Sequence, residues 1–482
     1  MSSIDQILNN AFAPVGDAMA SVVFYAEPFT GYDIKLILVW LVAASVFFSL
    51  YLGFINLRGF KHAIDLLRGK YDDRNGGEDG QINRFQALSA SLSGTVGLGN
   101  IAGVAIAVSV GGPGAVFWMG LMGFLGVSTK FAEVMMGVKY RVHGSEERPE
   151  KVSGGPMYYI KQAFVSRGWP RVGMMLGGLF AVCGVAGSIG AGNLFQANQS
   201  FTQLLNVTGD DQSFLADKRW LFGLLLAGMV GVVIIGGIKS IARTASRIVP
   251  VMGGLYLLIG LIFILMNWQQ VPAALVEIVT LAFDPSSAYG GILGALLMGV
   301  QRASFSNEAG LGSAAIAHAA AKTDQPVSQG FVGMLGPFID TIIICLTTAL
   351  VIVISGAYHE SDGIEGVKLT SRALESSING ASYVLTLVVL LFAYSTMITW
   401  YYYGEKCLTY LCGENDRMVM VFKIVFCSFI VVGVSMKDLG NVMNVTDSMV
   451  FIMAIPNVIG LYVLAPEIRR DLKAYWASIK KD

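Results

Sequence analysis

Two stretches of this 482-residue sequence place glycine, hydroxyl and amide side chains inside otherwise apolar segments. The first stretch, residues 91–100, contains a Gly-Leu-Gly triplet at 97–99, and the second, residues 304–313, contains another at 310–312. Glycine inside a helix costs about 1 kcal/mol relative to alanine, and peptide groups left unpaired in hydrocarbon cost several kcal/mol more. Such stretches indicate helices that unwind where they line a polar cavity.

The matching positions of the two triplets favour a transporter. Close helix packing through glycine explains either triplet alone. Together they interrupt the first helix of residues 86–266 and the first helix of residues 291–464, which is typical of an inverted-repeat transporter with a site at the bilayer midplane. A glycine-rich dinucleotide-binding loop is excluded because no strand or soluble βαβ unit surrounds either triplet.

The composition is that of a polytopic membrane protein. The chain is 54% hydrophobic and 14% charged, with a mean hydropathy of +0.61, whereas soluble domains are about a quarter charged. A membrane-spanning helix needs about 20 apolar residues. Eleven such segments are predicted, at residues 36–56, 86–109, 113–138, 172–206, 220–238, 246–266, 291–317, 327–355, 381–404, 418–436 and 443–464.

The predicted fold is all-α, with about eleven transmembrane helices in two inverted five-helix repeats, each with a broken first helix, plus one extra N-terminal helix. The apolar stretch 271–283 is too short to cross and predicts an interfacial or re-entrant segment. The predicted divisions are an external N-terminal segment 1–35, the extra helix 36–56, the repeats 86–266 and 291–464, and a cytoplasmic tail 465–482. The N-terminal segment is expected to contain an amphipathic helix on the membrane surface.

The lysines and arginines predict the orientation. With the N-terminus outside, the inside segments are 57–85, 139–171, 239–247, 318–326, 405–423 and the tail, and they hold 25 basic residues against 6 in the outside segments. Cytoplasmic loops carry such an excess. We therefore expect an external N-terminus and a cytoplasmic C-terminus in a plasma membrane, here a bacterial inner membrane.

Several other classes of function are disfavoured. The four histidines and five cysteines show no metal-ligand spacing, and no nucleophile–base set is apparent, so neither an enzyme nor a cofactor is expected. A net charge of zero predicts no nucleic-acid partner. A passive channel would show a continuous polar stripe along several helices, whereas polarity here concentrates at the two triplets.

A series of motifs resembles the alanine/glycine:cation (sodium:alanine) symporter family across nearly the whole chain. Two positions depart from the usual pattern, Leu98 in place of a frequent threonine and Gly120 in place of a second tryptophan. The motifs are Gly97-Leu-Gly-Asn-Ile-Ala-Gly-Val-Ala105, Gly111-Gly-Pro-Gly-Ala-Val-Phe-Trp-Met119, Thr129-Lys-Phe-Ala-Glu133, Val138-Lys-Tyr-Arg141, Gly154-Gly-Pro-Met-Tyr-Tyr159, Gly192-Asn-Leu-Phe-Gln-Ala-Asn198, Ser306-Asn-Glu-Ala-Gly310 and Tyr402-Tyr-Gly-Glu405.

The resemblance implies the leucine-transporter fold and movement of a small neutral amino acid, alanine or glycine, together with sodium. Amides at Leu98 and Gly99 would hold the substrate carboxylate, because a half-helix N-terminus offers unpaired N–H groups. The implied substrate-binding residues are Thr95, Gly97, Leu98, Gly99, Asn193, Gln196, Ser306, Asn307, Glu308 and Trp400. Two alternatives remain open: Asn193 and Gln196 as interhelical hydrogen-bond partners, and Trp400 as an interface anchor.

The resemblance also implies a sodium site, since sodium takes oxygen ligands from unwound carbonyls and hydroxyls. Carbonyls of Ser93 and Val96 and hydroxyls of Ser395 and Thr396 would form it. A weaker second site would lie near Thr95, Asn100 and Ser306. No metal other than sodium is implied.

Charged residues inside the predicted spans are functional hypotheses by default, since each costs about 2.5–3.5 kcal/mol at the membrane centre. Glu308 and Asp340 are the deepest, and Asp340 is a candidate to neutralise a cation. For Asp340, a structural salt bridge with Arg302 and a gating role are equally weighted. Lys130 and Glu133, three residues apart on one helix, predict a local ion pair.

The sequence thus predicts a secondary active symporter whose partners are a small neutral amino acid, a sodium ion and the lipid bilayer. A proton-coupled amino acid transporter and an amino acid sensor on a transporter scaffold remain as alternatives. The preferred amino acid, the coupling ion and the oligomeric state are left open.

Overall fold

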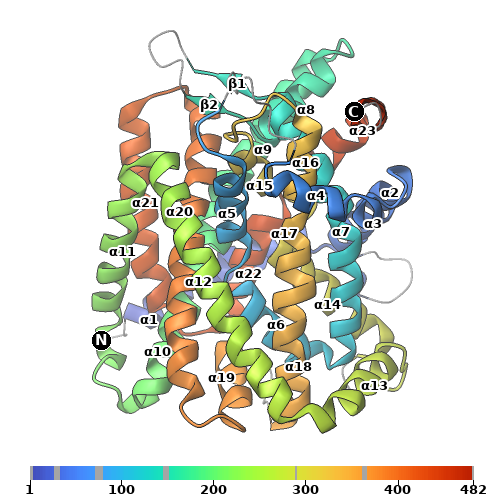
Figure 1. Ribbon diagram of the computed structural model, residues 1–482. Coiled ribbons are helices and arrows are strands. Elements are labelled where there is room, and N and C mark those ends of the chain that lie inside the picture. The colour runs from blue at the N-terminus through green and yellow to red at the C-terminus, as the bar shows by residue number, and fades with distance from the viewer. Residues whose placement is uncertain are drawn as a thin grey trace.

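The computed structural model describes residues 4–26, 33–70, 80–144, 151–287, 290–360 and 366–479, and of residues 4–11 the backbone only. The described chain is a bundle of helices with one antiparallel hairpin, in which β1 (Val142–His143) pairs with β2 (Val152–Ser153) (Figure 1). The predicted all-α class is confirmed.

Helices occupy every predicted span. In the first half they are α5 (Arg84–Thr95), α6 (Val104–Gly111), α7 (Gly114–Lys139), α9 (Pro170–Ile189), α10 (Phe195–Thr208), α11 (Arg219–Ile235) and α12 (Gly237–Met266). In the second half they are α14 (Gly291–Asn307), α15 (Ser313–His318), α16 (Pro326–Gly333), α17 (Leu335–Pro337), α18 (Leu346–Ser355), α20 (Ala381–Cys412), α21 (Asp416–Ser435), α22 (Leu439–Phe451) and α23 (Ala454–Ile479).

Shorter helices and π-helical turns complete the chain. The helices are α1 (Ile4–Val23), α2 (Leu36–Tyr51), α3 (Ile55–Arg58), α4 (Phe60–Leu67), α8 (Pro156–Val165), α13 (Val271–Ala282) and α19 (Val367–Glu375). The π-helical turns are Gly99–Gly103, Gly190–Leu194 and Phe338–Cys345. The second of these joins α9 to α10, and the third joins α17 to α18.

Within the described ranges, eight helices are long and apolar enough to cross a membrane, and the bent pair formed by α5 and Gly99–Gly111 makes a ninth. The helix α2 has 16 residues and α14 has 17, both shorter than the length that an untilted span needs. The protein is therefore a multi-pass membrane protein, while the count of eleven spans stays a prediction.

Both Gly-Leu-Gly triplets break their helices, as predicted. After Thr95 the chain leaves the helix and bends by 50° before it resumes. In the second break Glu308, Gly310 and Gly312 all have positive φ, of 55°, 91° and 83°. Glycine adopts this left-handed conformation without penalty. For Glu308 the conformation costs free energy, and the contacts described below hold the residue in it.

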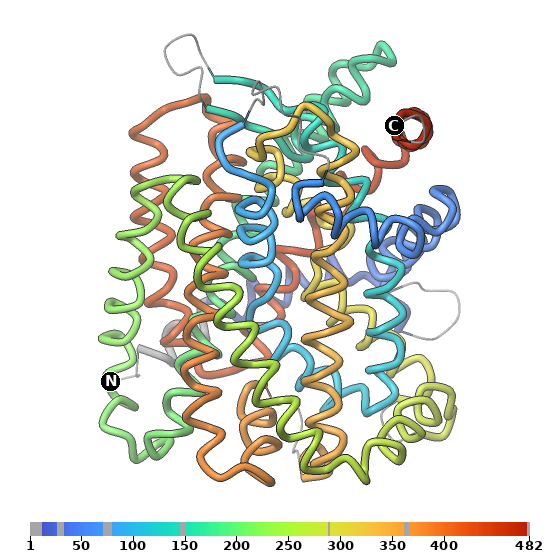
Figure 2. Tube along the Cα trace, in the orientation of Figure 1, coloured from blue at the N-terminus to red at the C-terminus, as the bar shows by residue number. Residues whose placement is uncertain are grey.

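The distribution of basic residues predicts that certain segments share one side of the membrane. In the structure, these segments lie toward one end of the bundle. The helix α4, the β1–β2 hairpin, α8 and the C-terminus are there, while α13 and α19 lie at the opposite end (Figure 1). Figure 2 shows residues 84–111 passing through the middle of the bundle. There α5 packs on α12 and α20, and α6 packs on α14 and α18.

The two ends of the chain differ in part from expectation. The N-terminal segment is helical, as predicted, and α1 packs on α22, where the Asn444 amide donates to the Asp17 carboxylate at 3.0 Å. Residues 1–3 and 27–32 of that segment lie outside the described ranges. At the other end, α23 continues through Pro466 to Ile479, so residues 465–479 are helical where only a tail was expected.

Candidate substrate and cation site

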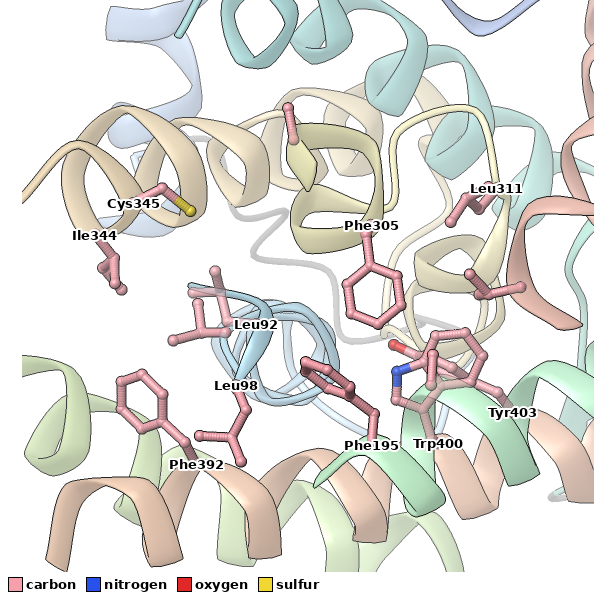
Figure 3. Packing of buried hydrophobic residues seen from close by; sticks show 14 of the residues in the cluster. Leu92, Leu98, Phe195, Phe305, Leu311, Ile344, Cys345, Phe392, Trp400 and Tyr403 are labelled. Carbon is pink, nitrogen blue, oxygen red and sulfur yellow. The ribbon is translucent and has the colours of Figure 1, made fainter. Parts of the chain in front are cut away.

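The two broken helices meet in the interior of the bundle. An ideal Cβ on Gly99 would lie 3.4 Å from the Ser306 Cα and 3.4 Å from the Phe305 ring. Phe305 and Phe195 face each other edge-on, with ring centroids 5.3 Å apart. In Figure 3 both rings and Trp400 lie beside the helix that carries Leu92 and Leu98. The breaks are thus enclosed by aromatic side chains.

The first break exposes backbone N–H groups to polar side chains. The Leu98 amide donates to the Gln196 Oε1 at 3.0 Å, and the Gly97 amide donates to the Asn100 Oδ1 at 2.9 Å. These are the amides of a helix start, which attract negative charge. The break can therefore bind a carboxylate that replaces or joins the Gln196 oxygen.

Of the two amides predicted on the helix opposite, Gln196 contacts the first break directly, whereas the Asn193 amide nitrogen bonds to another helix. The Asn193 amide donates to the Phe426 carbonyl on α21 at 2.6 Å. This contact fits the alternative of an interhelical hydrogen bond. The Asn193 Oδ1 is buried without a hydrogen-bond partner among the described residues, so a place for Asn193 in the pocket stays a prediction. The two residues lie three apart across the junction of the π-helical turn with α10, where a small change in helix phase decides which one faces the break.

The predicted cation residues of α5 and α20 lie together. The Ser93 hydroxyl donates to the Ser395 carbonyl at 2.7 Å, and the Ser395 hydroxyl donates to the Phe392 carbonyl at 3.1 Å. The Thr396 hydroxyl is buried without a hydrogen-bond partner among the described residues, and it faces Gly97. A buried hydroxyl without a partner costs free energy unless a ligand satisfies it, so its oxygen is suited to a cation.

A second polar cluster joins both breaks to the π-helical turn Phe338–Cys345. The Asn100 amide donates to one oxygen of the Asp340 carboxylate at 2.6 Å, and the Ser306 and Thr341 hydroxyls each donate to the other at 2.9 Å. The Asn307 amide donates to the Thr341 hydroxyl at 3.1 Å. Thr95 stays outside this cluster, because its hydroxyl donates to carbonyls of its own helix.

An ion pair on α7 holds the second break. Lys130 and Glu133 pair at 3.5 Å, as predicted, but their stronger contacts are with the unwound backbone. The Lys130 ammonium donates to the Glu308 carbonyl at 2.8 Å, and the Glu133 carboxylate accepts the amides of Gly310 and Gly312 at 2.8 and 3.0 Å. The pair thus replaces hydrogen bonds that the interrupted helix lacks.

The Glu308 side chain lies between the second break and Trp400. One carboxylate oxygen accepts the Trp400 indole N–H at 3.2 Å, and the other accepts the Ser313 hydroxyl. The Trp400 side chain is 2% exposed, and an added Cβ on Gly192 would clash with its ring. This burial excludes the alternative that Trp400 anchors the chain at the membrane interface.

The partner of Arg302 is Asp447 on α22, not Asp340 or Glu308. The two side chains form a buried ion pair, and the Gln301 amide also donates to the Asp447 carboxylate, at 2.9 Å. The alternative that Asp340 forms a salt bridge with Arg302 is therefore wrong, because Arg302 pairs with Asp447 and the Asp340 carboxylate accepts hydrogen bonds from its own polar cluster. Asp447 could have been found as a lone carboxylate within the predicted span 443–464.

One further contact at the second break could not be predicted from the sequence. The Asn457 amide on α23 donates both to the Glu133 carboxylate and to the Gly310 carbonyl, each at 2.8 Å. Asn457 accepts in turn from the Tyr159 hydroxyl of α8. An asparagine in an apolar span is common as an interhelical hydrogen bonder, so its residue type alone does not indicate a role at the break.

Comparison with known proteins agrees with this geometry. The model of the sodium:alanine symporter family matches residues 17–482. The sodium/alanine symporter AgcS of Methanococcus maripaludis is 38% identical over 91% of this chain and 93% of its own length. The probable sodium/glutamine symporter GlnT of Bacillus subtilis is 36% identical over 92% of this chain and 88% of its own length.

The fold is also that of a solved transporter. The crystal structure of MhsT in complex with L-phenylalanine covers 83% of this chain and all of that chain, with a TM-score of 0.51 and 14% sequence identity. At that identity the likeness concerns the fold, which is the leucine-transporter fold that the motifs implied. The family match over nearly the whole chain makes this protein a transporter rather than an enzyme, and the chain belongs to the sodium:alanine symporter family.

Proposed function

We propose that this protein couples the uptake of a small neutral amino acid, alanine or glycine, to the inward movement of sodium. Alternating access would take place around the two breaks. The observation that carries the proposal is the buried Thr396 hydroxyl at the first break, which faces Gly97 and has no hydrogen-bond partner in the part of the chain that the structure describes. The similarity to the sodium/alanine symporter AgcS and to the probable sodium/glutamine symporter GlnT supports it.

The substrate would bind with its two charged groups in opposite breaks. Its carboxylate would meet the amides of residues 97–99, next to Gln196, and its ammonium would meet the carbonyls of residues 306–308 and the Glu308 carboxylate. The space beside Gly99 is bounded by Phe305 at 3.4 Å from an added Cβ. The Phe305 ring would limit the size of the substrate side chain on this side.

Sodium would bind where the first break meets α20. Its ligands would be the carbonyls of Ser93 and Val96 and the hydroxyls of Ser395 and Thr396. The Asp340 cluster, with Asn100 and Ser306, is the second candidate site. A carboxylate there offsets the charge of a cation that enters the membrane interior.

The deciding experiment is uptake into proteoliposomes, with current and labelled alanine measured together in sodium and in choline at fixed pH. A zwitterion adds no net charge, so each cycle carries only the charge of its cations, and each charge gains about 2.3 kcal/mol per 100 mV. We expect a sodium-dependent inward current, and competition by glycine but not by arginine. Uptake driven by pH alone would favour proton coupling, and substrate binding without uptake would favour a sensor.

Replacing Thr396 with alanine is expected to raise the sodium concentration for half-maximal uptake by about tenfold or more. The change removes one charged-group contact, worth about 1.5–3 kcal/mol, without filling the substrate space. Ser428→Ala is the matched control, because that hydroxyl donates to its own helix at Ile424 on the exposed face of α21. An unchanged sodium dependence in Thr396→Ala, with uptake intact, would remove the cation site from this position.

We further propose that the chain resides in the bacterial inner membrane with its N-terminus outside and its C-terminus in the cytoplasm. The 25 basic residues in one set of connecting segments support this orientation. Reporter fusions after Tyr25 should read outside, and fusions after Lys480 should read inside. The reverse result would invert both the orientation and the direction of transport.

A further inference from the structure

A cavity of about 620 Å³ lies between the end of α2 and the last turns of α23, away from the two breaks. Both elements are on the same side of the bundle in Figure 1. Its lining combines apolar, aromatic and basic side chains: Leu50, Tyr51, Leu52, Gly53, Arg58, Arg469, Leu472, Lys473, Trp476 and Ala477.

The residues that line the cavity carry positive charge and no negative charge. Arg58, Arg469 and Lys473 line it, and none of the ten lining residues is acidic. The Arg58 guanidinium donates to the Leu52 carbonyl at 3.3 Å, and the Arg469 guanidinium lies 4.8 Å from the centre of the Tyr51 ring. Across the described ranges, the Lys473 ammonium makes no hydrogen bond or ion pair.

Two other cations near the acids of α23 are paired with them. On the same helix, the Arg470 guanidinium pairs with Asp471 at 3.0 Å. The Lys139 ammonium pairs with Glu467 and Asp471. The acids of α23 are thus already engaged, and the cavity lacks an anion of its own.

The surroundings of the cavity fit the boundary between lipid hydrocarbon and headgroups. The apolar helix α2 ends at Tyr51, and the chain then turns sharply through Gly53 and Phe54, both with positive φ. Leu50, Phe54 and Leu57 beside this turn are 60%, 42% and 64% exposed. Exposed apolar side chains next to aromatic and basic residues are typical of that layer of the membrane.

We propose that this cavity binds an anionic phospholipid, with its phosphate between Arg58, Arg469 and Lys473. An acyl chain would lie along Leu50 and the exposed side of α2. The lipid would thereby bridge α2, which stands outside the two repeats, to α23. The ligand is a membrane lipid rather than an acidic protein segment, because the basic residues stand at the end of an apolar spanning helix and beside exposed apolar residues.

The test measures lipid binding to the purified full-length protein by native mass spectrometry and by the rise in melting temperature on lipid addition. Phosphatidylglycerol is compared with phosphatidylcholine of the same acyl chains. Glycerol phosphate, which has the anionic group but no acyl chains, is the third ligand. We expect phosphatidylglycerol alone to bind tightly and to stabilise. The triple variant Arg58→Gln, Arg469→Gln, Lys473→Gln should weaken its binding about a hundredfold, since each basic residue contributes about fivefold.

The matched control removes three exposed cations from helices that do not line the cavity: Lys161→Gln on α8, Arg171→Gln on α9 and Arg417→Gln on α21. The double variant Arg469→Gln, Lys473→Gln leaves the Arg58 contact with Leu52 in place and should still lose more than tenfold. Equal loss in the control triple, or equal binding of both lipids to the unaltered protein, would overturn the proposal. Competition by glycerol phosphate as strong as by the lipid would make this a free-anion site and overturn the lipid assignment.

Discussion

The variant Gly97→Ala is expected to abolish amino acid transport, whereas Gly103→Ala six residues later should transport normally. A Cβ on Gly97 would lie 2.5 Å from the Thr396 Oγ1 and 3.1 Å from the Gln196 Oε1. Neither side chain can move away from the added methyl group without leaving the site. The Thr396 side chain is short, and the Gln196 side chain accepts a hydrogen bond from the Leu98 amide. A single methyl group would therefore disturb the proposed carboxylate and sodium positions together. Initial rates of labelled alanine uptake measure the loss, which we expect to exceed a hundredfold.

Gly103 is a stringent control for this prediction. It lies in the π-helical turn that follows the same break, it is buried, and an added Cβ would meet nothing within 4 Å. Alanine also costs less backbone entropy than glycine on folding, so this variant should fold at least as well. If both variants lose transport, the effect lies in the flexibility of the segment and not in the space at Gly97. If Gly97→Ala transports normally, the site is not at the first break.

The second large effect is expected on stability, at the buried pair of Arg302 and Asp447. Arg302→Met or Asp447→Leu alone should destabilise the protein by about 3–5 kcal/mol, because each leaves an uncompensated buried charge. The double variant should be close to the parent, since replacing a whole buried ion pair by apolar residues is often neutral. Unpaired nitrogens on Arg302 and an unpaired oxygen on Asp447 favour this outcome. Thermal unfolding in detergent provides the measurement.

The same double variant separates a structural role of the Arg302–Asp447 pair from a role in gating. A stable double variant that transports at the parental rate would make the pair purely structural. A stable double variant that binds alanine but does not transport it would place the pair in the gating of the site. Singles as stable as the parent would contradict the buried placement of the pair.

Much of the architecture could be predicted because it depends on residues that are neighbours in the chain. The spans follow from the length of apolar segments, and the two breaks follow from glycine and polar side chains within them. The Lys130–Glu133 pair follows from helical spacing. Even here the end of the last helix was misjudged: polar residues such as Arg469 and Asp471 lower the hydropathy, but α23 remains helical to Ile479.

What the sequence determined by itself is therefore the bundle of spanning helices, the position of both breaks and the family. The tertiary structure alone decided the partners across helices: Asp447 for Arg302, Asn457 for Glu133, and Phe426 for Asn193. These pairings depend on which helices are neighbours and on the rotation of each about its axis. A rotation by one residue, about 100°, directs a side chain to a different neighbour. Because that phase is set by packing over the whole bundle, no local pattern of residues contains it.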